Sequence, residues 1–289
     1  MIQIATDLKT LETQVDALVP KWRSRAKTRT TRFIKQKAYK EESSIWGEIK
    51  AVFMKLQHNK CAYCERELAA PPLGSGEHDL EHFRPKGRIE PYPTADAGVM
   101  YSFQTGNSQA NGYYWLAYNL ENYAVACITC NRGLKADRFP IAGTRGAADT
   151  SVSDLNQIEL PLLLFPLLDN PEEFITFDGA MPKTVFKRGI KYQRAVVTIN
   201  FFGLGDTQRE ELFRGRFAVI RELYLQYEKI KLPSETAHTK ELAQIVVDGL
   251  CDQKSGHSAC AKAYHILLQN DPMRAWKIYE TAAMYQLRS

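Results

Sequence analysis

No stretch of this 289-residue sequence is apolar for long enough to cross a membrane. A membrane-spanning helix needs about 20 consecutive, mostly apolar residues, and the aliphatic stretch at 162–165 is flanked by Pro161 and Pro166. The first residues also lack the apolar central region of a secretory signal peptide. We therefore expect no membrane association and a cytoplasmic location.

Cysteine is scarce, with six residues in the chain. In a reducing compartment, cysteines are metal ligands or buried thiols more often than disulfides. Acidic residues are missing from one region: segment 21–40 contains nine Lys or Arg and no Asp or Glu, although the net charge of the chain is only +5. Such a block is typical of a surface that faces nucleic acid or an acidic partner. A solvated basic helix face is the alternative.

The pattern of apolar residues predicts helices at both ends of the chain. Apolar residues make up 44% of the sequence and charged residues 25%, as in ordinary soluble globular proteins. Apolar residues recur every three or four positions in residues 1–57 and again in residues 188–289, which predicts an N-terminal and a C-terminal helical region. The fold class that we expect is α+β, mainly helical.

The central part of the chain is less regular. Residues 58–140 hold the distinctive motifs and include a loop insertion at 87–112, which is rich in Gly, Pro, Asn and Ser. Region 141–187 is expected to begin with a linker, because small polar residues dominate as far as residue 160. Two short candidate strands follow, at 162–165 and 174–177.

Four of the six cysteines form two Cys-x-x-Cys pairs: Cys61 with Cys64, and Cys127 with Cys130. Two intervening residues let both thiolates of a pair turn onto one ion, and tetrahedral zinc takes four such ligands. A closed shell of four thiolates leaves no open position for substrate, so we expect this zinc to be structural. Four buried cysteines without metal are the alternative. Cys251 and Cys260 fit no such spacing and are expected to be reduced, partly buried thiols.

The residues between these pairs offer the groups that phosphodiester hydrolysis needs. A histidine can take a proton from the attacking water, and a hard divalent ion held by oxygen ligands can stabilise the leaving oxygen. His82 offers the base, and Glu81 and Asn131 offer oxygen ligands. Because adjacent strand residues point to opposite sides, Glu81 and His82 would need a bent backbone to serve one site. Asp79, two residues before Glu81, is a rival ligand.

Three motifs occur in order along the chain: Cys61-x-x-Cys64, then Glu81-His82-x-x-Pro85, then Asn122-x4-Cys127-x-x-Cys130-Asn131-x3-Lys135. They resemble the zinc-containing HNH endonucleases, in which a two-stranded hairpin and a helix surround one catalytic metal ion, the ββα-metal or His-Me finger fold. Segments 61–65, 81–86 and 114–118 resemble more closely the PtuB-like HNH subunit of Septu-type anti-phage defence systems.

The resemblance implies a small zinc-stapled ββα-metal core with helical additions on both sides. It implies His82 as general base, Glu81 and Asn131 as ligands of a catalytic Mg²⁺ or Mn²⁺, and Asn122 as the residue that braces the hairpin. The chain departs from many relatives in having Glu at the first ligand position and Asn at the last.

The resemblance also implies a protein partner. Septu-type systems pair the nuclease with an ABC-type ATPase, a PtuA-like subunit. This chain has no Gly-x4-Gly-Lys-Ser/Thr loop of its own. Any control by ATP would therefore come from that subunit.

Basic residues around the motifs are candidates for phosphate contacts, since phosphate charge dominates nucleic-acid affinity: Arg84, Lys86, Lys135 and Arg138. The aromatic cluster at 113–118 is expected to pack against the zinc knuckle, with base stacking as the alternative. His58 and His78 are expected to face solvent.

The function that we expect is a metal-dependent HNH endonuclease that hydrolyses phosphodiester bonds of DNA, as the effector of an anti-phage defence complex. Two alternatives stay open. One is a zinc-stapled nucleic-acid-binding or scaffold module without catalysis. The other is an HNH nuclease that acts on RNA, such as tRNA.

Overall fold

A computed structural model of the chain describes residues 1–70, 76–94 and 98–286. The regular structure is mainly helical, as the sequence predicts. The α-helices are α1 Leu8–Leu18, α2 Trp22–Gln36, α3 Lys50–Leu56, α4 Val152–Glu159, α5 Gly189–Phe201, α6 Glu210–Lys231, α7 Ala237–Cys251, α8 Ser258–Asn270 and α9 Pro272–Gln286. The strands are β1 His78–His82, β2 Tyr123–Cys127, β3 Ile175–Asp178 and β4 Met181–Thr184. Short 3₁₀ helices lie at η1 Trp46–Ile49, η2 Tyr114–Leu116, η3 Leu120–Asn122 and η5 Pro171–Glu173, and η4 Thr129–Lys135 is a π-helix.

The N-terminal helices form where apolar spacing and capping agree. Asp7 caps α1 by accepting a hydrogen bond from the Thr10 amide at 2.8 Å, and Leu11 and Val15 bury its inner face. Helix α2 contains most of the basic block, buries Trp22, Ala26 and Phe33, and turns its Lys and Arg residues outward. Most of the basic block is therefore the exposed face of an amphipathic helix.

Strands β1 and β2 form an antiparallel pair whose register places His78 opposite Cys127 and His82 opposite Tyr123. All five residues of β2 are buried. The π-helix η4 follows β2 directly, so the order strand, strand, helix is present at the centre of the motif region. Helix α3 packs against both strands.

Residues 141–187 differ from the prediction in two places. The expected strand at 162–165 is not a strand, although all four residues are fully buried. Its amides donate elsewhere: Leu164 to the Thr198 hydroxyl at 2.9 Å and Phe165 to the Asp169 carboxylate at 2.8 Å. The run at 162–165 is apolar because it is buried. Side-chain oxygens, and not a partner strand, accept the hydrogen bonds of the Leu164 and Phe165 amides. The second expected strand exists one residue later, as β3, and pairs with β4.

The segment expected as a linker contains helix α4. Ser151 caps this helix by accepting a hydrogen bond from the Asp154 amide at 3.1 Å, and Val152 and Leu155 are buried. Insertion 87–112 has no helix or strand in its described part, as expected. An antiparallel bridge joins Ile89 to Gln109 within it, and a parallel bridge joins Glu90 to Arg138.

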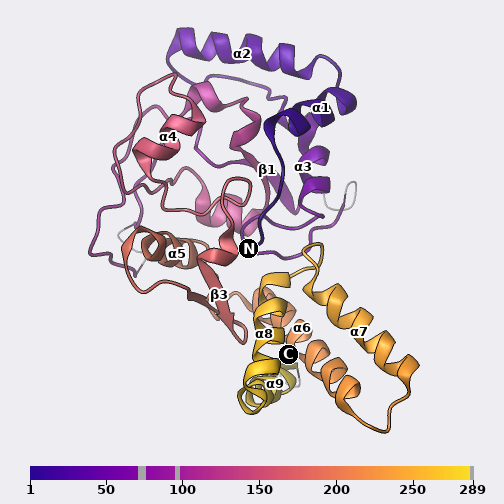
Figure 1. Cartoon of the computed structure of the whole chain (residues 1–289). Helices are drawn as coiled ribbons and strands as arrows, with labels where there is room; N and C mark the ends of the chain where they lie inside the picture. The colour runs from indigo at the N-terminus through magenta and orange to yellow at the C-terminus, as the bar shows by residue number, and fades with distance from the viewer. Residues whose placement is uncertain (71–75, 95–97, 287–289) are drawn as a thin grey trace.

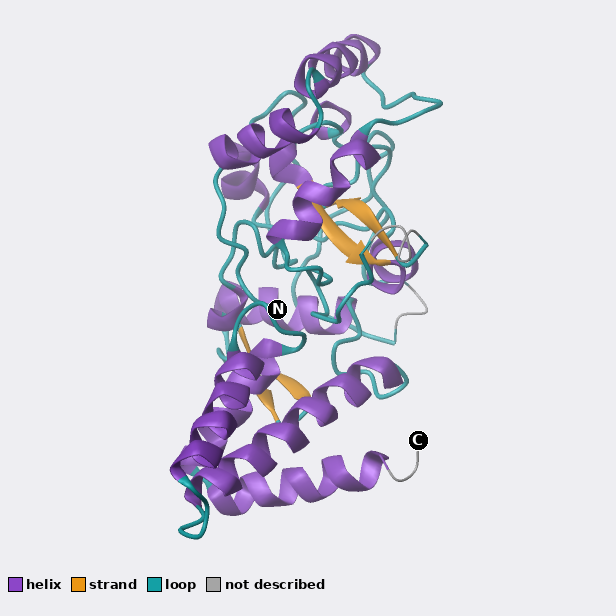
Figure 2. Cartoon of the chain, turned by 90° about the vertical axis from the view of Figure 1, so that its right-hand side faces the viewer, coloured by secondary structure: helices purple, strands orange, loops and turns teal. Residues whose placement is uncertain are grey.

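Two hydrophobic clusters divide the molecule. The larger unites the N-terminal helices, the β1–β2 pair, α4 and α5. The smaller belongs mainly to α6–α9, which lie together at one end of the molecule in both views (Figures 1 and 2). Helix α5 thus packs with the first cluster, although it lies in the C-terminal helical region of the sequence. Among the described residues, no helix combines the length and apolar character needed to cross a membrane.

Candidate metal centre and active site

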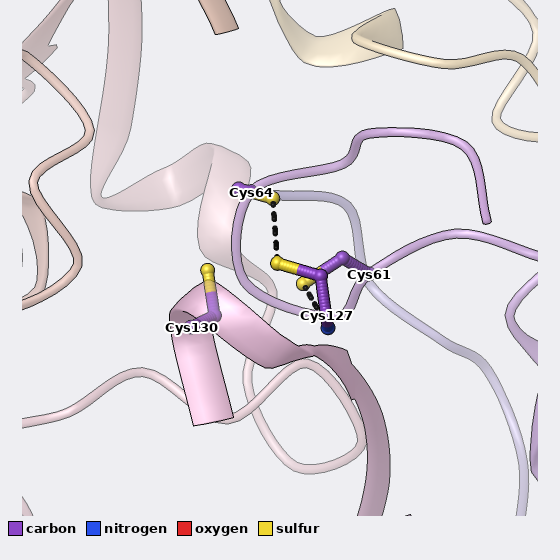
Figure 3. A group of neighbouring side chains, drawn as sticks. All are labelled: Cys61, Cys64, Cys127 and Cys130. Atoms are coloured by element: carbon purple, nitrogen blue, oxygen red, sulfur yellow. Dashed lines mark hydrogen bonds between the residues drawn. The ribbon is translucent and has the colours of Figure 1, made fainter. Parts of the chain in front are cut away.

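The four cysteines of the two Cys-x-x-Cys pairs meet at one point (Figure 3). Cys61 and Cys64 lie in the loop after α3, Cys127 ends β2 and Cys130 lies in η4. Their sulfur atoms all lie within 4.8 Å of one another, all four side chains are buried, and none forms a disulfide. Four converging thiols from two tight turns match the ligand set and size of a tetrahedral zinc site. The cluster can therefore hold a structural metal such as zinc.

Burial and the hydrogen bonds within the cluster shift the pKa values of its thiols in different directions. Burial raises the pKa of Cys61. Hydrogen bonds from Cys130 first, and then from Cys61 and Cys64, lower the pKa of Cys127. The Cys127 amide also donates to the Cys61 sulfur at 3.3 Å. A cation at the centre would favour the thiolate form of all four.

His82 lies at the end of β1 in a pocket of aromatic rings. The ring centroids of Trp46 and Tyr123 are 4.8 Å and 5.0 Å from that of His82, both nearly perpendicular to it. The Nε2 atom lies 3.0 Å from the Ala117 carbonyl oxygen. A carbonyl only accepts, so Nε2 carries the hydrogen and Nδ1 remains the acceptor. Burial, reinforced by the charge of Lys86, holds the pKa of His82 well below its ordinary value, so the imidazole is neutral at neutral pH.

Glu81 contacts a different set of residues. Its carboxylate accepts a hydrogen bond from the Tyr63 hydroxyl at 3.0 Å and lies 3.1 Å from the Lys135 ammonium. Burial raises the pKa of Glu81, and the charge of Lys135 opposes that shift. Glu81 and His82 thus follow the alternation of a regular strand, and the bend that a shared site would need is not present in β1.

Asn131 lies near the start of η4 and contacts Asp79. Its side-chain amide donates to the Asp79 carboxylate at 3.1 Å, and Arg132 holds the same carboxylate at 2.7 and 2.9 Å. In this structure, Asn131 therefore bonds to the rival ligand Asp79, while Glu81 bonds to Lys135. A divalent ion on Glu81 and Asn131 would require both side chains to change partners.

Asn122 is buried beneath the residues that follow His82. Its side chain accepts a hydrogen bond from the Arg84 amide at 2.7 Å and donates to the Arg84 carbonyl at 3.0 Å. The Asn122 carbonyl also accepts from the Phe83 amide at 2.8 Å. These three bonds fix the backbone just after His82, which is the geometry that a bracing role requires.

Two of the four expected phosphate contacts lie in the interior, and for these two the prediction is wrong. Arg84 is 1% exposed and pairs with Glu159, which is 0% exposed, at 2.9 Å. Lys135 is also 0% exposed and binds Glu81 and the His82 carbonyl. Each of these cations is paired with a buried carboxylate that lies far away in the sequence, Glu159 for Arg84 and Glu81 for Lys135. Lys86 and Arg138 are half-buried and remain candidates.

Lys86 and Trp46 lie together beside His82, although no sequence pattern indicates this contact. The Lys86 ammonium lies 4.7 Å from the Trp46 ring centroid and 5.3 Å from that of Tyr39. Trp46 in turn touches His82. Trp46 precedes the Glu81-His82 motif by more than thirty positions, so no local spacing could have identified it.

The structure bears on two smaller expectations, of which the first is wrong. His78 does not face solvent: it is fully buried, and its Nε2 lies 3.0 Å from the Ala69 carbonyl oxygen. The aromatic cluster at 113–118 is buried, which favours packing over base stacking. Its packing partners include Trp22 and Phe33 of α2, whose ring centroids lie 6.0 and 6.1 Å from that of Tyr118.

Comparison with known proteins gives one similarity. The chain is 31% identical over 190 residues to the Septu protein PtuB of Bacillus mycoides (strain KBAB4), and the match covers 65% of this chain and 55% of that protein. The chain therefore spans about half the length of the curated relative that it matches. No family model matches the sequence, and no solved structure matches the fold. The expected resemblance to PtuB-like proteins is confirmed.

Proposed function

We propose that this protein is a metal-dependent endonuclease of the HNH kind that acts on DNA as the effector of a Septu-type anti-phage defence system. The observation that carries the proposal is the state of His82. Its ring is held by the Ala117 carbonyl so that Nδ1 is the acceptor, at the end of a hairpin that the four-cysteine cluster joins to a helix. The similarity to PtuB supports the defence role.

The chemistry assigned to His82 is proton removal from the attacking water. A neutral imidazole with one nitrogen fixed and the other free is suited to that step. The leaving oxygen also needs charge stabilisation, which a Mg²⁺ or Mn²⁺ ion would supply. Glu81 and Asn131 would hold that ion only after two changes. Glu81 would exchange Lys135, and Asn131 would exchange Asp79, for the ion. The end of β1 would also have to bend, so that Glu81 faces the same site as His82. Asp79 is near enough to Asn131 to serve as an alternative ligand.

Helix α2 is the strongest candidate for contact with the nucleic-acid backbone. Acidic side chains neutralise part of the positive charge of α2 through ion pairs. These pairs are Arg23 with Asp16, Arg25 with Glu48 and Arg29 with Glu41. Lys27 and Lys35 are exposed, and no ion pair engages them among the described residues. These lysines would add a sequence-independent, salt-sensitive contribution to binding.

The partner that we propose is a PtuA-like ABC-type ATPase. The similarity to a Septu protein is the support for it, together with the absence of a phosphate-binding Gly-x4-Gly-Lys-Ser/Thr loop from the sequence. The ATPase would control access to the nuclease site rather than take part in hydrolysis.

One observation favours a second candidate, a zinc-stapled binding module without catalysis. Glu81 is engaged by Lys135 and Tyr63, and Asn131 by Asp79, so the proposed metal ligands do not converge. A non-catalytic module would keep these contacts permanently.

Cleavage of supercoiled plasmid by the full-length protein separates the two functions. The assay is run with Mg²⁺ or Mn²⁺, with and without the ATPase, and with an RNA transcript and tRNA as parallel substrates. We expect cleavage of DNA by the wild type and none by His82→Ala, while His238→Ala, which removes an exposed histidine on α7, behaves as the wild type. Nucleic-acid binding without cleavage of any substrate would favour the binding module, and cleavage of RNA alone would correct the substrate.

A further inference from the structure

The four-cysteine cluster belongs to the larger hydrophobic cluster, and residues that flank helices of the smaller cluster contact it or its neighbours. On one side, the loop between α7 and α8 covers the first cysteine turn. The buried Lys60 ammonium donates to the carbonyls of Gln253 and Ser255, the latter at 2.9 Å, and the His257 amide donates to the Glu65 carbonyl at 3.3 Å. Both Lys60 and Glu65 are immediate neighbours of metal-ligand candidates in the sequence.

On the other side, Arg209 reaches the cluster from the residue before α6. Its Nη1 and Nη2 donate to the Cys130 sulfur at 3.7 and 3.8 Å, and Nη1 also donates to the Phe202 carbonyl. The side chain is 8% exposed. Among the described residues, Arg209 is the cation whose side chain bonds to a cysteine sulfur. Both of its terminal nitrogens thus contact one edge of the metal centre, and Nη2 also forms an ion pair with the half-exposed Glu211 carboxylate at 3.1 Å.

The charge of a loaded centre explains why such a contact matters. Four thiolates around Zn²⁺ carry a net charge of −2, and a buried net charge is costly unless it is paired and hydrogen-bonded. Hydrogen bonds to metal-bound sulfur spread that charge and hold the ligand in place. The Lys60 ammonium does not serve this purpose, because it is directed at backbone carbonyls.

We propose that Arg209 is a positioning residue of the metal centre, and that through it metal binding is coupled to the docking of α6–α9 onto the rest of the protein. The Arg209 guanidinium offsets part of the negative charge of the centre when α6 is docked, so docking strengthens metal binding. By thermodynamic reciprocity, the metal strengthens docking to the same extent. The inference depends on metal in the four-cysteine cluster and not on nuclease activity.

The separate core of α6–α9 gives the coupling a definite outcome. Phe213, Ile220, Leu223 and Tyr264 are buried among residues of the smaller cluster. Helices with a core of their own can keep their secondary structure when their contact with the larger cluster loosens. Metal removal should therefore release these helices rather than unfold them.

Zinc affinity measured by competition with a chromogenic chelator tests the first half of the proposal. The variants are Arg209→Gln, Arg209→Lys and Arg214→Gln, the last removing an exposed charge from the first turns of α6. We expect a roughly 10- to 100-fold weaker affinity for Arg209→Gln, a smaller loss for Arg209→Lys, and none for Arg214→Gln. Circular dichroism checks that each variant is folded.

A spectroscopic signature distinguishes an effect on the sulfur from a general loss of stability. With Co²⁺ in place of zinc, the thiolate-to-metal charge-transfer band should shift in Arg209→Gln and stay unchanged in Arg214→Gln. Wild-type affinity and an unshifted band in Arg209→Gln would overturn the proposal. So would a purified protein that contains no metal at the cluster and binds none.

Hydrogen exchange on the full-length protein tests the coupling. Zinc removal should accelerate exchange at residues 253–258 and at the start of α6, while the inner amides of α6 and α8 stay protected. Unchanged exchange at 253–258, or equal loss of protection in both cores, would contradict the coupling. A protein that passes these tests but cleaves no nucleic acid would sink the nuclease proposal and leave this inference standing.

Discussion

Replacing Glu159 by Leu should destabilise the protein strongly, because it leaves the buried Arg84 without its anionic partner. Arg84 donates to Glu159 at 2.9 Å in a setting where neither side chain is more than 1% exposed. Glu159 also accepts from the Tyr113 hydroxyl at 2.6 Å and from the Gly146 amide at 3.1 Å. The substitution removes all three bonds and leaves the Arg84 charge with one neutral side-chain partner, Asn156.

The magnitude follows from the cost of an uncompensated buried charge. Breaking a buried ion pair by removing one partner costs about 3–5 kcal/mol. Replacing both charged residues by apolar residues of similar size costs far less, and such double replacements often leave the free energy of unfolding nearly unchanged. We therefore expect about 3–5 kcal/mol for Glu159→Leu, a comparable loss for Arg84→Met because Glu159 is then unpaired, and partial recovery in the double variant.

Urea unfolding of the zinc-loaded, full-length protein gives the free energies for this double-mutant cycle, and nucleic-acid binding is measured on the same preparations. A cost below about 1 kcal/mol for Glu159→Leu, the range of a surface pair, would refute the reasoning. So would an Arg84→Met variant of wild-type stability with weakened binding at every salt concentration. That result would restore Arg84 as a phosphate contact.

Three other outcomes follow from the structure. Charge reversal at Lys27 and Lys35 should lower the slope of log binding constant against log salt by about 2 for duplex DNA, at roughly 0.9 per phosphate contact, whereas Lys277→Glu on α9 should leave it unchanged. Burial, reinforced by the charge of Arg216, lowers the pKa of His257 to about 4, so the unfolded chain binds a proton at higher pH than the folded protein does. The free energy of unfolding should therefore fall by about 3 kcal/mol as the pH drops from about 6.5 to 4. In urea titrations, His257→Gln should lose that part of the pH dependence. Cys127→Ser should abolish zinc binding, measured by atomic absorption, and cleavage together, while Cys251→Ser should affect neither.

The cysteine cluster and the long helices could be predicted because their signals are local. Two residues between paired cysteines dictate a turn that presents two sulfurs, and the chemistry of zinc requires that two such turns meet. In the same way, apolar residues at helical spacing predict α1 and α6 without knowledge of what they pack against. These inferences need no information from distant parts of the chain.

The environment of the candidate site could not be predicted, because it depends on contacts between distant segments. Lys135 and Arg84 appeared to be free cations in the sequence, but Glu81 and Glu159 neutralise them in the interior. His82 owes its aromatic pocket to Trp46, which lies in a different region of the chain. The run at 162–165 has the composition of a strand, but its Leu164 and Phe165 amides donate to side-chain oxygens and not to a partner strand.

In the proposed function, a metal at the four cysteines stabilises the structure, and His82 carries out the chemistry. The most direct test measures plasmid cleavage and zinc content on the same preparation of His82→Ala, with the ATPase present and Mg²⁺ or Mn²⁺ supplied. We predict one zinc per chain, as in the wild type, and no cleavage. Cleavage by His82→Ala at the wild-type rate would contradict the account.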